Sequence, residues 1–144
     1  MKKLEIPTEI FQEMIAQARE LAPIEACGIL AGRNGIVEKY YKMTNVDNSR
    51  THFMMEPKEQ FATIKDIRSA DLEMLAIYHS HPETPARPSA EDIKLALTPD
   101  VIYVIVSLQN TNGSAIKGFH IPAPSEVEGA GTNVTEVTIK ILDR

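Results

Sequence analysis

The sequence has little of three things: cysteine, long apolar runs and concentrated positive charge. Cys27 is the only cysteine in the 144 residues, so no disulfide can form within the chain and we expect a reducing, cytoplasmic setting. Residues 1–7 include basic side chains but no apolar core behind them, so we expect no secretory signal peptide. No run approaches the roughly 18 apolar residues of a membrane span, so no membrane partner is expected.

Positive charge is outweighed by negative charge and is dispersed along the chain. There are 15 Lys and Arg residues against 20 Asp and Glu, which gives a net charge of −5. A phosphate-binding surface needs a local concentration of basic residues, so nucleic acid is not expected as the main partner. The length suits one domain with a buried core, and we expect a single domain over residues 1–144.

The most informative stretch is a pair of histidines at the end of an apolar run. Residues 74–78 are apolar and short, which is typical of a buried strand. Side chains alternate along a strand, so His79 and His81 share one face and Ser80 points to the other. Two imidazoles side by side are a ready pair of zinc ligands. Pro82 has no backbone N–H for strand pairing and should end the strand.

A carboxylate follows on a predicted helix that begins after Ser89 and extends to Leu97. Asp92 would lie in the first turn, placed to approach the histidines, and two His with one Asp and an open position is typical of catalytic zinc. Ser-x-x-Asp is also close to a capping box, in which Asp92 would bond back to the Ser89 backbone. The two roles compete for Asp92, and the nearby histidines favour the metal ligand. Glu25 is the best candidate for a general base.

These residues together resemble the JAMM (MPN+) metalloprotease motif. That motif is His-x-His, seven residues, Ser, two residues and Asp, with an upstream Glu. Segments 23–28, 45–49 and 53–57 also resemble the stand-alone prokaryotic members, and the resemblance covers roughly residues 4–108. It implies one zinc per chain, Glu25 as general base and Ser89 as a hydrogen-bond donor to the oxyanion. The five motif positions are Glu25, His79, His81, Ser89 and Asp92.

The resemblance also implies a function. The expected enzyme is a zinc metallopeptidase or isopeptidase that hydrolyses an amide bond at the C-terminal tail of a ubiquitin-like, sulfur-carrier-type protein or its adduct, or of a peptide. Other zinc hydrolases with His-x-His usually need larger barrels, and a zinc deaminase needs a pair of cysteines. The remaining alternative is a catalytically silent scaffold or interaction module with the same fold.

Several single residues have a simpler structural interpretation. His52 and His120 are interpreted as structural histidines, and Cys27 as a small buried hydrophobe. Glu25 could be a solvated residue at a helix–strand junction, because nothing in the sequence brings it near His79. Arg87 could hold a substrate carboxylate or be an exposed structural arginine.

The rest of the chain predicts an α/β fold with a mixed curved β-sheet flanked by about three helices. This arrangement resembles the MPN/JAMM fold, and the resemblance implies a cytidine-deaminase-like architecture. Asn34-Gly35 predicts a hairpin turn. The second helix should turn Phe61, Ile64 and Ile67 inward. Residues 122–133 are expected to be a mobile loop. The other predicted elements are helices at 8–22 and 57–68 and strands at 4–6, 25–32, 36–43, 52–55, 101–108 (central), 115–121 and 134–141 (half-exposed, at an edge).

Overall fold

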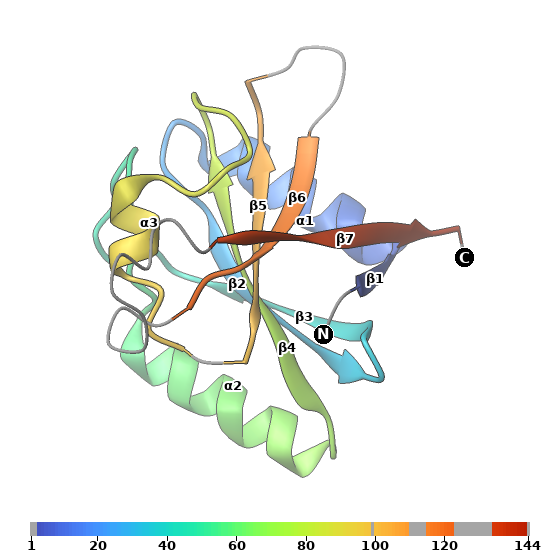
Figure 1. Cartoon of the computed structure of the whole chain (residues 1–144). Helices are drawn as coiled ribbons and strands as arrows, with labels where there is room; N and C mark the ends of the chain where they lie inside the picture. Colours follow the sequence, from blue (N-terminus) through green and yellow to red (C-terminus); the bar gives the residue numbers. More distant parts are fainter. Residues whose placement is uncertain (1–2, 99, 110–114, 123–133, 144) are drawn as a thin grey trace.

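The computed structural model describes residues 3–98, 100–109, 115–122 and 134–143 (Figure 1). The predicted loop at 122–133 lies, apart from Pro122, outside the described residues. The elements in chain order are β1 (Lys3–Pro7), α1 (Thr8–Leu21), β2 (Cys27–Arg33), β3 (Ile36–Met43), α2 (Pro57–Ser69), β4 (Glu73–His81), α3 (Ala90–Lys94), β5 (Ile102–Ser107), β6 (Ala115–His120) and β7 (Thr135–Leu142).

The strands form a closed barrel in the order β1-β3-β2-β4-β5-β6-β7. The sheet is mixed, as predicted, because β1 pairs in parallel with both β3 and β7, and β4 in parallel with β5. The strands close into a barrel instead of the predicted curved sheet, and the prediction of an edge strand at 134–141 is wrong, because β7 pairs with both β1 and β6. Alternation along a strand reveals that one face is buried; it carries no information on whether the strand has one neighbour or two.

Alternating side chains divide the core into two clusters on opposite faces of the sheet. The first contains Tyr78 and Val104 and packs against Met14 of α1. The second contains Ile77 and includes Ile67 of α2. β5 is buried along its whole length, which confirms the central strand predicted at 101–108. His79 and His81 follow Ile77 at two-residue steps, so they project from the face of the second cluster.

Local signals account for much of the first half of the fold. Asn34 and Gly35 have φ values of 54° and 77°, so the predicted hairpin turn joins β2 to β3. Pro57 begins α2 as predicted, and the Glu56 side chain caps this helix by accepting the backbone N–H of Glu59 at 2.7 Å. At Gly28 an added Cβ would lie 2.7 Å from the Tyr41 carbonyl oxygen, which explains the glycine in this strand.

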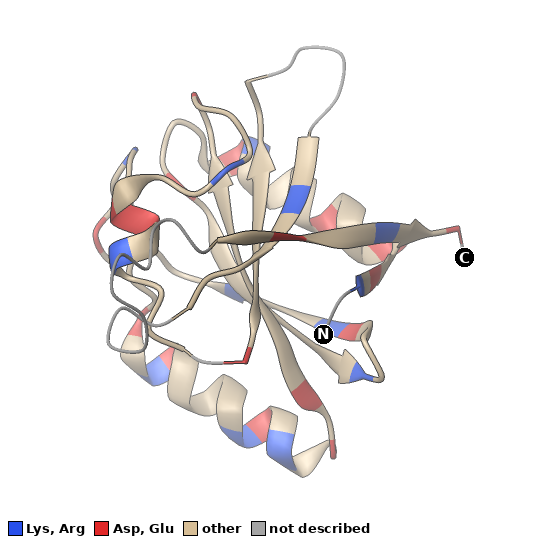
Figure 2. Ribbon diagram, viewed as in Figure 1, with Lys and Arg blue, Asp and Glu red and all other residues tan. Residues whose placement is uncertain are grey.

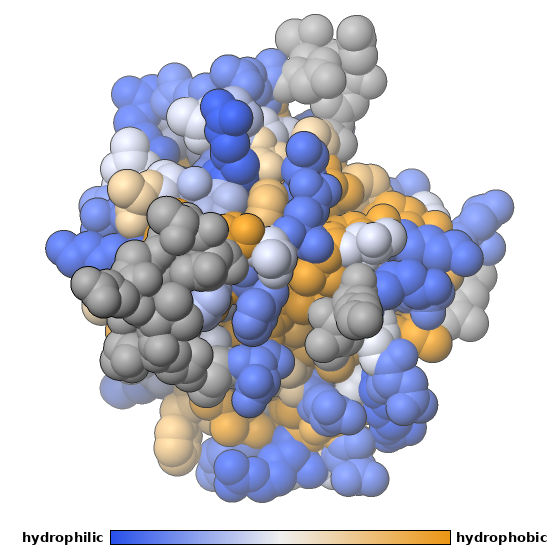
Figure 3. Space-filling view, viewed as in Figure 1, coloured by the Kyte–Doolittle hydropathy of each residue, from blue (hydrophilic) through white to orange (hydrophobic). Residues whose placement is uncertain are grey.

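The inward face of α2 differs from the prediction. Ile67 is buried as expected, but Phe61 is 67% exposed and Ile64 is 37% exposed. The buried stripe is Thr63 and Ile67, four residues apart, and the Thr63 hydroxyl donates to the Met43 sulfur at 3.9 Å. Apolar side chains therefore reach the surface along α2 (Figure 3), where basic and acidic residues are interspersed (Figure 2).

Two short segments also form less regular structure than predicted. Residues 52–55 form a single bridge, between Met55 and Asn45, instead of a strand. α3 ends at Lys94 instead of Leu97, and Leu95 and Leu97 are 47% and 67% exposed, so they do not supply the buried face that would prolong the helix. Among the described residues, no helix combines the length and apolar character required to cross a membrane.

Candidate metal centre

His79 and His81 lie side by side at the end of β4, as the alternation predicts. Both are buried, and their Nε2 atoms are 3.1 Å apart. Ser80 points to the opposite face, where its hydroxyl accepts the backbone N–H of Ala26 at 2.7 Å. The strand ends at His81, immediately before Pro82. The alternation of side chains along β4 therefore places both imidazole rings on one face of the strand.

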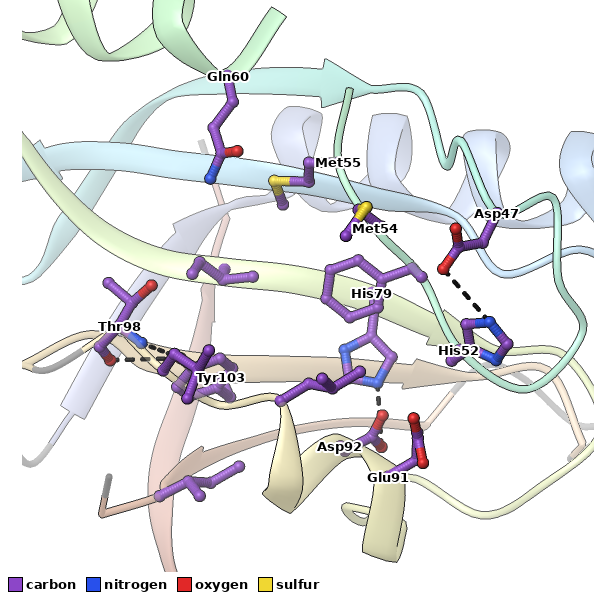
Figure 4. Close-up of a pocket in the computed structure, with 15 residues that line it drawn as sticks. Asp47, His52, Met54, Met55, Gln60, His79, Glu91, Asp92, Thr98 and Tyr103 are labelled. Carbon is purple, nitrogen blue, oxygen red and sulfur yellow. Dashed lines mark hydrogen bonds and ion pairs between the residues drawn. The ribbon is translucent and has the colours of Figure 1, made fainter. Parts of the chain in front are cut away.

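Asp92 comes from the first turn of α3 and completes a triangle with the histidines. Its Oδ2 atom is 2.9 Å from His81 Nε2. The same atom is 3.2 Å from His79 Nε2 (Figure 4). The same Oδ2 accepts the Ser89 backbone N–H at 2.9 Å, and the Ser89 hydroxyl accepts the Asp92 N–H at 3.0 Å. The capping box and the approach to the histidines therefore coexist, and the predicted competition for Asp92 is wrong. The same carboxylate oxygen therefore serves the helix cap and faces both histidines.

The donor atoms of this triangle fit a zinc ion. His81 Nδ1 lies 2.8 Å from the Pro85 carbonyl oxygen, which can only accept, so Nδ1 carries a proton and a neutral ring has its lone pair on Nε2. That lone pair faces the Asp92 carboxylate, and a cation between the two, a proton or a metal ion, would satisfy both. Ligands about 2.0–2.1 Å from a tetrahedral zinc lie roughly 3.3 Å apart, close to the spacings of the triangle. His79, His81 and Asp92 can thus hold a metal.

The electrostatics of the triangle favour a charged Asp92. Burial raises the pKa of the Asp92 carboxyl, but its hydrogen bonds with the two histidines outweigh burial and hold the pKa below its usual range. Burial lowers the pKa of His79. Burial also acts to lower the pKa of His81, but its hydrogen bonds to Asp92 and to the Pro85 carbonyl leave that pKa raised.

Glu25 reaches the same face through the pairing of β2 with β4. Cys27 lies opposite His79, and Ala26 exchanges hydrogen bonds with Ser80, so the antiparallel register places Glu25 opposite His81. Glu25 is 2% exposed, and its Oε1 atom has no hydrogen-bond partner among the described residues. Burial raises the pKa of Glu25 from 4.5 to about 8, with His81 opposing and Asp92 reinforcing the shift. The alternative of a solvated Glu25 is therefore wrong.

Two residues that support the site were missed by sequence reasoning. Phe53 stacks on the His79 ring with centroids 4.8 Å apart, although the predicted strand at this position gave it no role. Asn45 is buried, and its Nδ2 donates to the carbonyl oxygens of Glu25 and His52, both at 3.1 Å. Asn45 Oδ1 accepts the backbone N–H groups of Asp47 and Met54. Both residues lie in segments that resemble the family, 45–49 and 53–57, but nothing in the sequence assigned either side chain a contact with the site.

A cavity of about 430 Å³ adjoins the triangle (Figure 4). Its wall includes His52, which the sequence led us to interpret as a structural histidine. The Nε2 atom of His52 lies 3.3 Å from Asp47 Oδ2. The other described wall residues are mainly apolar, and His79 and Asp92 also line the cavity. Apolar wall residues include Phe53, Met54, Met55, Ile77, Leu95, Leu97 and Ile121.

The remaining candidate residues lie outside the triangle. Cys27 is buried, as expected of a small hydrophobe, and burial raises the pKa of its thiol to about 12. His120 is exposed at the end of β6 and lies away from the cavity wall. Arg87 is exposed in the segment between β4 and α3, and Ser89 is exposed at the cap of α3.

Residues 7–117 match the family described as prokaryotic homologs of the JAB domain. The chain is 36% identical over 143 residues to the CysO-cysteine peptidase of Mycobacterium tuberculosis, covering 98% of this chain and 92% of the relative. It is 37% identical over 125 residues to a probable TtuB-protein conjugate cleaving protease of Thermus thermophilus, covering 86% and 80%.

Solved structures show the same fold. A protein from Desulfitobacterium hafniense has a TM-score of 0.83 and 39% identity, covering 98% of this chain and 94% of that one. A structure described as JAMM, a metalloprotease-like zinc site in the proteasome and signalosome, has a TM-score of 0.59 and 16% identity, covering 97% and 98%. The predicted MPN/JAMM-like α/β fold is confirmed, apart from the closure of the sheet.

The raised pKa of Glu25 predicts a pH-dependent stability in the metal-free protein. The folded state favours the protonated acid, so stability is full below pH 4.5 and falls as the pH rises from 4.5 to about 8. Glu25→Gln should match the wild type near pH 4.5 and exceed its free energy of unfolding by about 2 kcal/mol or more at pH 8.5. Urea unfolding with a chelator measures this, with the exposed Glu38→Gln as control. An equal difference at both pH values would contradict the burial of a neutral Glu25.

Proposed function

Because the chain belongs to the family of prokaryotic homologs of the JAB domain and is a hydrolase of the JAMM type, we propose that it is a zinc metallopeptidase acting on a ubiquitin-like carrier protein or its adduct. The observation that supports this most is the convergence of five motif positions. The His79–His81–Asp92 triangle, the buried Glu25 and the cap residue Ser89 come from β4, α3 and the segment before β2. A silent scaffold would be expected to lack at least one of them.

The metal site of the proposal consists of three side chains. His79, His81 and Asp92 would hold one zinc ion per chain, and the Pro85 carbonyl would keep the His81 ring in the tautomer that presents Nε2. When bound, zinc supplies a water whose pKa is lowered towards about 7. The stacked ring of Phe53 shields His79 from solvent and restrains its orientation.

Glu25 is proposed as the general base. It lies opposite His81. One oxygen of its carboxyl, Oε1, has no hydrogen-bond partner among the described residues. In the reaction it accepts a proton from the attacking water and returns that proton to the leaving amine. Two features keep its backbone in place, because Asn45 donates to the Glu25 carbonyl and the Glu25 N–H donates to the Ser49 carbonyl at 2.9 Å.

Ser89 is proposed to stabilise the oxyanion that forms on the substrate carbonyl. Its oxygen accepts the Asp92 N–H, which leaves the hydroxyl proton free to donate. The residue is exposed at the edge of the site, where a substrate can reach it. Such a donor contributes about 2.7–4 kcal/mol to the transition state. The cap thus orients the hydroxyl while its proton remains available.

The names of the two relatives support a carrier adduct as substrate. One relative is named for CysO-cysteine and the other for conjugates of TtuB with protein. We propose that the substrate is a ubiquitin-like, sulfur-carrier-type protein whose C-terminal tail enters the site. In this proposal the chain acts as a single domain, and neither nucleic acid nor a membrane takes part. The cavity beside His79 has an apolar wall that can receive an apolar side chain next to the scissile amide.

Replacing the base separates chemistry from metal binding. Glu25→Ala should keep about one zinc per chain and lose turnover by about 10²–10⁴-fold, because no other group takes the proton. The assay is release of a fluorescent amine from a carrier protein ending in Gly-Gly, with zinc measured in the same samples. Glu38→Ala, at an exposed position on β3, is the control. Cleavage by Glu25→Ala at the native rate would rule out this mechanism.

Ser89 has two roles that can be separated by substitution. Ser89→Ala should lower kcat by about 10²–10³-fold through loss of the donor, and should destabilise the fold by about 1 kcal/mol through loss of the cap. Ser89→Thr retains both the hydroxyl and the cap and should restore most of the rate. If Ser89→Ala is merely less stable and cleaves normally, the residue is only a cap.

A further inference from the structure

The ring of His52 lies between two side chains of its own loop, which runs from β3 to α2. Its Nε2 atom is 3.3 Å from Asp47 Oδ2 (Figure 4), and its Nδ1 atom is 3.1 Å from the Ser49 hydroxyl oxygen. A carboxylate only accepts, so Nε2 carries the proton, and Nδ1 of a neutral ring accepts the hydroxyl proton of Ser49. Ser49 Oγ in turn accepts the backbone N–H of Thr51 at 3.1 Å. Both ring nitrogens therefore have a partner within the loop.

This loop has little regular structure to maintain its shape. Residues 46–54 belong to no helix or strand, and a single bridge between Asn45 and Met55 joins their two ends. The conformation of such a segment depends on hydrogen bonds between its side chains and its backbone. The His52 ring joins residues 47 and 49, and the His52 carbonyl oxygen accepts Asn45 Nδ2 at 3.1 Å. His52 is therefore linked to three points along the loop.

Two residues of the same loop contact the candidate site. The Ser49 carbonyl oxygen accepts the Glu25 N–H at 2.9 Å. Phe53 stacks on the His79 ring with an interplanar angle of 25°. His52 is hydrogen-bonded to Ser49 through its ring and directly precedes Phe53 in the chain. A change in the conformation of the loop at His52 would therefore disturb the contacts with both Glu25 and His79.

We propose that His52 is a positioning residue, whose ring holds the loop in the conformation that places Glu25 and His79. The restraint passes from the ring through Ser49 to the Glu25 backbone, and through the chain to the ring of Phe53. Its effect on turnover rests on the proposed function, in which Glu25 takes the proton of the attacking water. A displacement of about 1 Å in a reacting group lowers a rate by about 10²-fold, so a residue that only positions these groups has a large effect.

The first test measures hydrogen exchange of the Glu25 backbone amide by NMR, in the full chain without substrate. His52→Ala should speed this exchange at least about 10-fold, as expected when one hydrogen bond is weakened, and leave the amide of Val104, buried on β5, unchanged. In His52→Asn the side-chain oxygen can accept the Ser49 hydroxyl in place of Nδ1, so exchange should stay within about 3-fold of the wild type.

The comparison of amides separates positioning from general stability. A variant that merely unfolds more often exposes Glu25 and Val104 together, whereas a loosened loop affects Glu25 alone. Equal exchange of the Glu25 amide in the wild type and in His52→Ala, or equal acceleration at Glu25 and Val104, would overturn the inference.

The second test measures turnover of a carrier substrate by the zinc-loaded protein. His52→Ala should lower kcat at least about 10-fold and leave KM within about 3-fold, because the residue acts through Glu25 and His79 and not on the substrate. His52→Asn should restore most of kcat, and His120→Ala, exposed at the end of β6, is the matched control that should change neither. A raised KM with an unchanged kcat would show that His52 contacts the substrate, and would overturn the positioning role.

The two tests distinguish this inference from the proposed function. If the wild type cleaves no carrier substrate, the proposed function is wrong, but faster Glu25 exchange in His52→Ala and not in His52→Asn would still support the role of His52 in the loop. If the wild type cleaves the substrate and His52→Ala matches it in both exchange and kcat, the inference alone is wrong.

Discussion

The antiparallel pairing of β2 with β4 is the constraint on which the candidate site depends. It sets Cys27 opposite His79, and the hydrogen bonds between Ala26 and Ser80 continue the register so that Glu25, two residues before the strand begins, lies opposite His81. The Ser80 hydroxyl strengthens this register because it accepts the Ala26 N–H on the face away from the histidines. A slip of one residue would move Glu25 to the other face of the sheet and separate it from the triangle.

The short helix α3 combines a structural and a proposed chemical role in one residue. A five-residue helix has little stability of its own, and its capping box supplies part of what its length does not. The capping carboxylate of Asp92 is also the acid that approaches the two histidines, so the structural and the proposed chemical role are held by one oxygen atom. Metal binding and the folding of this segment should therefore be coupled.

Much of this site could be predicted from short-range patterns. Alternation along β4 places His79 and His81 on one face, and Ser89-x-x-Asp92 marks the start of a helix. The position of Glu25 could not be predicted from the residues, because it lies 54 positions before His79 (79 − 25) and reaches it only through strand pairing. The stacking of Phe53, the hydrogen bonds of Asn45, the exposed Phe61 and the closure of the barrel through β7 likewise depend on contacts between distant segments.

All of the proposed chemistry depends on zinc held by the His79–His81–Asp92 triangle. The most direct test is elemental analysis of zinc per chain in the wild type and in His81→Ala, with His120→Ala, exposed at the end of β6, as the matched control. We expect about one zinc in the wild type and in His120→Ala, and almost none in His81→Ala. An absence of zinc from the wild type after zinc is supplied, or its full retention in His81→Ala, would show that the triangle is not the zinc site.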